Sequence, residues 1–106
     1  MNLSRTKASS EVQLDCERFL TTKWVFSPNS ETGWHRHNYD YIVVPLSDGQ
    51  LSLETDKGEK DSILKRGGSY SRTKGVEHNV INKSLAEVSF IEIELKEPNF
   101  GSLPND

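Results

Sequence analysis

Short segments in which apolar and polar side chains alternate recur along the whole chain. Three of them are residues 19–26 (FLTTKWVF), 51–55 (LSLET) and 89–95 (SFIEIEL), and a fourth strand-like segment, residues 42–46 (IVVPL), is apolar on both faces and should lie in the middle of the fold. No window of about 11 residues or more keeps the apolar spacing of an amphipathic helix. The pattern therefore predicts β-strands, and it places Ile91, Ile93 and Leu95 on one face of the last of them.

Turn signals separate these segments. Gly, Asp and Ser cluster at residues 47–49, 56–58 and 67–68, so turns recur about every ten residues. That spacing predicts roughly six to nine short strands in an all-β sandwich or closed barrel. Pro45 has no backbone donor, so we expect a bulge or an unpaired point at that residue.

The chain length fits a single domain. Its 106 residues and 12.0 kDa can supply one modest core and no more. We expect an ordered barrel over about residues 11–96. The ends, residues 1–10 and 97–106, are polar or rich in Pro and Gly, and we expect them to be loosely held.

Composition narrows the class of protein. Apolar residues make up 33% of the chain, charged residues 27%, and the mean hydropathy is -0.67, so no run approaches the ~20 apolar residues of a membrane span. Residues 1–10 contain no apolar stretch, which predicts a cytoplasmic protein without a secretory signal. A net charge of -3 with scattered Lys and Arg provides no basic stripe for nucleic acid. The single cysteine, Cys16, excludes an intrachain disulfide, and we expect it to be buried.

Candidate chemistry concentrates in the three histidines, His35, His37 and His78. His35 and His37 are separated by one residue, and on a strand such residues point to the same face with backbones about 6.5–7 Å apart. Two imidazoles at that separation can tilt toward one ion, each placing a nitrogen ~2.0–2.2 Å from it. Taken alone, such a pair is more often a surface pair or one satisfied within the core.

A second spaced pattern surrounds the third histidine: Gly67-x5-Thr73-x-Gly75-x2-His78-x3-Asn82. Gly75 permits a positive-φ turn before the strand that carries His78. Together with the paired histidines, this pattern resembles the two motifs of the cupin superfamily, small jelly-roll barrels that hold a metal inside. Thr73 stands where the second motif usually has proline, and the other spaced positions fit.

The first motif departs from the cupin pattern at its usual glutamate. Tyr41 or Ile42 takes that position, depending on the spacing counted, and neither is a good metal ligand. Asn29 stands at the leading glycine, and the closing Gly49 is displaced by one residue. The resemblance covers about residues 19–96. The chain is similar in particular to small single-domain cupins, some of them linked to β-alanine degradation.

The resemblance implies one divalent transition metal bound by His35, His37 and His78. Iron(II) is our first expectation, and zinc or nickel also suits three nitrogen ligands. It further implies a metal-dependent enzyme of the dioxygenase, isomerase or decarboxylase type that acts on a small metabolite. The alternative is a non-catalytic small-molecule-binding or sensor module with a structural metal or none. Open metal positions beside a cavity of ~300 Å³ or more would favour the enzyme.

Several other side chains are candidates for roles near this site. Tyr41 lies on the strand face that should point into the cavity, so it is a candidate catalytic residue whose phenol can orient a water or donate to an oxyanion. The alternative is a tyrosine that belongs to the core. Tyr39 lies on the same strand face as Tyr41, and we expect it at the cavity mouth. Arg72 suits recognition of a carboxylate, although a solvated loop arginine is commoner. Glu92 and Glu94 share one parity, which suits acid–base chemistry, but we expect an exposed face.

Apolar side chains before the first motif point to a homodimer. Residues 11–26 carry more apolar surface than a barrel of this size can bury once a cavity is present. An open apolar edge invites aggregation unless another chain covers it. We therefore expect a two-fold dimer in which the N-terminal strands pack against or join the partner's sheet. The alternative is a monomer whose C-terminal tail, with Phe100 and Leu103, folds back over the edge.

Overall fold

The computed structural model describes residues 4–97, and the regular elements within that range are all strands. They are β1 (Thr6–Lys7), β2 (Ser9–Asp15), β3 (Phe19–Phe26), β4 (Ser30–Glu31), β5 (His35–Arg36), β6 (Asp40–Pro45), β7 (Gly49–Thr55), β8 (Gly58–Leu64), β9 (Tyr70–Arg72), β10 (Glu77–Asn82) and β11 (Val88–Leu95). Each of the four strand-like segments of the sequence corresponds to one of the longer strands, β3, β6, β7 or β11.

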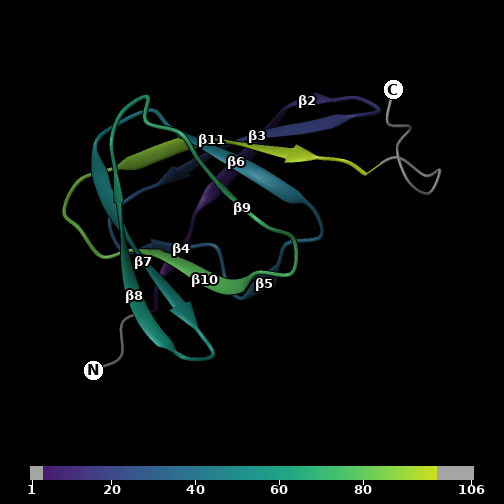
Figure 1. Ribbon diagram of the computed structural model, residues 1–106. Helices are drawn as coiled ribbons and strands as arrows, with labels where there is room; N and C mark the ends of the chain where they lie inside the picture. Colours follow the sequence, from purple (N-terminus) through teal and green to yellow (C-terminus); the bar gives the residue numbers. More distant parts are fainter. Residues whose placement is uncertain (1–3, 98–106) are drawn as a thin grey trace.

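The strands form two sheets that face each other (Figure 1). One sheet has the order β1-β4-β10-β7-β8, with β5 also paired to β10, and the other has the order β2-β3-β11-β6-β9. Most neighbouring strands are distant in sequence and antiparallel, which is the connectivity of a jelly-roll barrel. The expectation of an all-β jelly roll is confirmed.

The core lies between the two sheets, where alternate residues of each strand point inward. Phe26 is fully buried, and its ring stacks on Phe90 with centroids 5.7 Å apart. Leu64, Ile81 and Val88 complete the most deeply buried set of large apolar side chains. This packing holds β3, β8, β10 and β11 together and leaves the region around the histidines as the polar part of the interior.

The molecule is elongated because β2, β3 and the end of β11 extend beyond the barrel (Figure 1), and its principal extents are 56 × 28 × 20 Å. Every residue of β2 is exposed. Cys16, in the turn that follows β2, is exposed as well, so the expectation that it is buried is wrong. A buried position was expected because cysteine behaves as a small hydrophobe, but this turn lies outside the core.

The N-terminal segment takes part in both sheets. β1 and the beginning of β2 fall within residues 1–10, the segment expected to be loosely held. The corresponding expectation for the C-terminal tail, including Phe100 and Leu103, concerns residues outside the described range. Among residues 4–97, no helix has the length and hydropathy needed to cross a membrane.

Candidate metal centre

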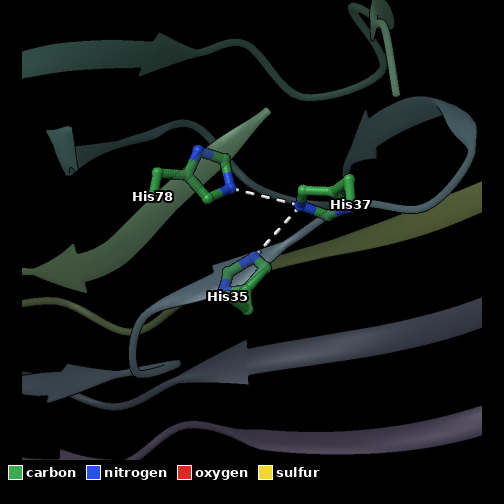
Figure 2. A group of neighbouring side chains, drawn as sticks. All are labelled: His35, His37 and His78. Atoms are coloured by element: carbon green, nitrogen blue, oxygen red, sulfur yellow. Dashed lines mark hydrogen bonds between the residues drawn. The ribbon is translucent and has the colours of Figure 1, made fainter. Parts of the chain in front are cut away.

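The three histidines converge from two places in one sheet. β5 pairs with β10 in a register that sets His35 directly opposite His78. His37 follows β5 and is tied to the turn before β10, because its N–H donates to the Val76 carbonyl at 2.9 Å while the Gly75 N–H donates to the His37 carbonyl at 2.8 Å. Figure 2 shows the three rings turned toward one another. His37 Nε2 lies 3.0 Å from His35 Nε2 and 3.2 Å from His78 Nε2.

These separations fit a shared metal ion. A metal ~2.1 Å from two nitrogens sets them about 3.0 Å apart at a right angle and about 3.4 Å apart at the tetrahedral angle. One ligand atom from each of the three histidines lies within 4.8 Å of the others. Within residues 4–97, this group includes no carboxylate. The nearby Asp40 is exposed, and its Oδ1 accepts a hydrogen bond from the Lys74 N–H at 2.9 Å.

The tautomer of His35 is fixed by its neighbours. Its Nδ1 lies 2.9 Å from the Gly33 carbonyl oxygen, which can only accept, so Nδ1 carries the proton and Nε2 keeps its lone pair. Gly33 is held in turn by Asn79, whose Oδ1 accepts the Gly33 N–H at 2.9 Å. Asn79 Nδ2 donates to Glu31 and Glu54, both at 2.9 Å. This chain of hydrogen bonds orients the His35 ring.

Burial keeps two of the imidazoles neutral. The pKa of His37 is lowered to about 3, chiefly by desolvation and then by His35 and His78. The pKa of His78 is lowered to about 4, again chiefly by desolvation, followed by His35 and Arg72. Both rings are therefore unprotonated at neutral pH, which is the form that can donate a lone pair to a metal.

Tyr41 stands beside this cluster. Its ring stacks on His37 with centroids 3.9 Å apart and an interplanar angle of 19°. The side chain is buried, as its parity predicts, and it lines the interior cavity. Burial and the charge of Glu92 raise the pKa of the Tyr41 hydroxyl, so the hydroxyl keeps its proton and can act as a donor. Tyr39 is half-buried and, within the described part of the chain, lines neither the cavity nor its mouth.

The histidines border two hollows. An interior cavity of about 40 Å³ is lined by His35 and His78 together with Tyr41, Tyr70 and Arg72, among others. A cleft of about 270 Å³ opens at the barrel mouth, and His35 and His37 form part of its wall. The cavity alone is far smaller than the ~300–1,000 Å³ of a typical ligand pocket, whereas the cleft approaches that range.

Residues 22–94 match the family described as Cupin domain. The chain belongs to the cupin family. The β-alanine degradation protein BauB of Pseudomonas aeruginosa is 51% identical over 92 residues, which cover 87% of this chain and 97% of that protein. The crystal structure of a cupin domain from Bordetella pertussis Tohama I superposes with a TM-score of 0.89 at 53% identity, covering 91% of this chain and all of that one. TT1209 from Thermus thermophilus, at 22% identity, shares the fold with a TM-score of 0.68 over 87% of this chain and 86% of its own.

The sequence pattern assigned Glu92 to the wrong face of its strand. The expectation of an exposed face is wrong, because Glu92 is buried and lines both the cavity and the cleft. Desolvation, and then the charge of Glu94, raise the pKa of Glu92 to about 7, while the Trp24 side chain opposes the shift. Glu94 is half-buried and lines the cleft. Arg72 is exposed at its outer part, with its guanidinium carbon 4.6 Å from the Tyr70 ring centroid.

The face of β11 explains this error. Val88, Phe90 and Glu92 point inward, whereas Ile91 and Ile93 lie on the outer face and are half-buried. Both faces of the strand carry large apolar residues, so alternation alone did not show which face is inside. Asn79 and Gly33 were also missed as supports of His35, because their contact joins segments that no spacing rule connects.

Proposed function

We propose that this cupin binds one divalent transition metal through the Nε2 atoms of His35, His37 and His78. The observation that supports it best is the convergence of three imidazole nitrogens, with two separations of 3.0 and 3.2 Å, at the border of a cavity. Three neutral nitrogen ligands suit iron(II), our first choice, and also zinc or nickel. When bound, such an ion acts as a Lewis acid with open coordination positions.

The favoured activity is metal-dependent conversion of a small metabolite. The name of the Pseudomonas aeruginosa relative, a β-alanine degradation protein, supports a substrate among small compounds of β-alanine metabolism. Tyr41 is proposed as the catalytic side chain of the protein. Its protonated hydroxyl on the cavity wall would hold a hydrogen bond to the substrate, and its stacking on His37 fixes the ring. Dioxygenase, isomerase and decarboxylase chemistry all suit this arrangement.

One observation favours the non-catalytic alternative. The interior cavity of about 40 Å³ holds little more than a few waters, since a single water needs roughly 10–15 Å³ of probe-occupied volume. A sensor or small-molecule-binding module with a structural metal is consistent with that size. The larger cleft at the mouth, which shares His35 with the cavity, is the reason for favouring the enzyme.

We also propose that the protein is a homodimer. Val12, Leu14 and Phe19 on the extended β2–β3 hairpin are exposed. The outer face of the same sheet sets Leu14, Thr21 and Ile93 in one row, because a bulge between Val12 and Leu14 shifts the register. A second chain that packs on this hairpin and sheet face would cover these apolar side chains.

Metal analysis of untagged protein, purified without added metal, tests the metal-binding proposal. We expect about one equivalent of metal per chain in the wild type and near-complete loss in both His35→Ala and His78→Ala, since each removes one of three ligands. Glu77→Gln is the matched control, because Glu77 is an exposed neighbour of His78 on β10. Normal metal content in His78→Ala would overturn the proposal, and circular dichroism verifies that each variant is folded.

A further inference from the structure

Glu92 is a buried carboxyl without a cationic partner. Its side chain belongs to β11 in the middle of the five-stranded sheet, in register with Thr22 on β3 and Val43 on β6. Glu92 is only 8% exposed, yet no Lys, Arg or His nitrogen of residues 4–97 comes within 4.0 Å of its carboxylate. A buried carboxylate is costly unless a positive or hydrogen-bonding group compensates it, and at Glu92 the Trp24 side chain supplies a hydrogen bond but no positive charge.

The position of Glu92 connects it to the histidine cluster. Four residues line both the interior cavity and the mouth cleft: Trp24, Thr32, His35 and Glu92. A molecule that enters through the cleft therefore meets Glu92 and His35 on the same path. Glu92 is therefore part of the wall that the two hollows share.

Charges along the cleft favour a positive group at this point. Glu94 lies two residues further along β11, points to the same side and also lines the cleft. The cations on that wall are Lys7 and Arg36, and Arg36 lies 3.7 Å from the exposed Glu77. The acidic side of the cleft is thus the β11 side. An ammonium group there relieves the repulsion between the two carboxylates and favours the ionised form of Glu92.

We propose that Glu92 is a ligand-binding residue that receives the ammonium group of a small primary amine held beside the three-histidine cluster. The inference rests on the proposed function, because the ligand is placed next to the proposed metal. The amine enters by the mouth cleft, its nitrogen donates to the Glu92 carboxylate, and Trp24 and Thr32 border its chain. A charge-assisted hydrogen bond of this kind is among the stronger polar contacts in proteins.

Arg72 offers a separate site for an anionic group. It lies on β9 opposite Tyr41, and Tyr41 lies opposite Glu94. Two strand spacings, about 10 Å, therefore separate the backbones of Arg72 and Glu94. Arg72 and Glu92 both line the interior cavity, so an anionic probe serves as a charge control: it has no ammonium group to donate to the Glu92 carboxylate.

Titration of zinc-loaded protein with propylamine and with propionate, followed by amide NMR shifts, tests this inference. We expect Glu92→Gln to raise the Kd for propylamine by about tenfold or more and not to raise the Kd for propionate. Glu87→Gln is the control, because Glu87 is exposed just before β11 and lines neither hollow, and it should change the propylamine Kd by less than about threefold. Glu92→Asp keeps the charge and should retain part of the affinity for propylamine. This second variant tests the inference if Glu92→Gln folds poorly.

Two results would overturn the inference: wild-type protein that does not bind propylamine, or a propylamine Kd that is the same in wild type and Glu92→Gln. Zinc content is measured on the same samples. Protein that takes up no zinc contradicts the proposed function, whereas stoichiometric zinc with an unchanged propylamine Kd contradicts only the role of Glu92.

Discussion

The two buried imidazoles make the metal-free protein sensitive to acid. Unfolding restores the pKa of His37 and His78 to about 6.5, from about 3 and about 4 in the folded chain. The folded state therefore binds fewer protons over this interval. The stability that these neutral rings provide is complete above pH 6.5 and is lost as the pH falls through the folded values.

We predict that the unfolding free energy of the metal-free protein falls by a few kcal/mol between pH 7 and pH 4. Urea unfolding over a pH series measures this free energy, and His37→Gln should flatten the curve because one titrating ring is removed.

Glu92 acts in the opposite direction: with a folded pKa of about 7, it makes the protein less stable as pH rises from about 4.5 to 7. Glu92→Gln should therefore steepen the acid loss. A pH-independent unfolding free energy in the wild type would contradict the prediction.

The turn between β9 and β10 holds the three-histidine cluster in place. Gly75 has φ +94°, a conformation that residues with a Cβ rarely adopt. Its N–H donates to the His37 carbonyl, and the next residue, Val76, accepts the His37 N–H. The geometry of this one turn thus sets where His37 stands relative to His78, which lies two residues after Val76.

We predict that Gly75→Ala destabilises the protein by about 1–2 kcal/mol and weakens metal binding by about tenfold, because strain in the turn moves His37. Gly58→Ala is the matched control: Gly58 also has a positive φ, +109°, and an added Cβ would meet nothing within 4 Å. It lies in the β7–β8 hairpin and should lower stability similarly without changing metal affinity. Equal metal affinity in the two variants would show that the turn between β9 and β10 has no effect on the site.

At the scale of the whole molecule, the proposed dimer would form through the extended β2–β3 hairpin and the outer sheet face. Light scattering at micromolar concentration should give a mass near twice the 12.0 kDa of one chain. Ile93→Lys places a charge on the outer face of β11, away from the cavity, and should yield monomers with normal metal content. Lys57→Glu, an exposed change in the distant β7–β8 turn, should leave the mass unchanged. A wild-type mass near that of one chain contradicts the dimer.

Local residue patterns were enough to predict the strand-rich fold and the grouping of the histidines. Alternation assigned His35 and His37 to one face, and the spacing around Gly75 and His78 brought the second motif into correspondence with the first. Asn29, which replaces a glycine of the pattern, has the positive φ that the pattern requires, +61°. These features depend on local backbone geometry, which neighbouring residues specify.

Only the tertiary structure decided which face of each strand is inside. Period-two alternation assigns residues to two faces without choosing between them, and β11 has apolar side chains on both. The choice is made by the partner strands and by the packing of Phe90 on Phe26, which turns Glu92 inward and leaves Ile93 outside. The same holds for the Asn79–Gly33 contact and for the size of the cavity. Both result from contacts between segments that are distant in sequence, which a local pattern of residues does not specify.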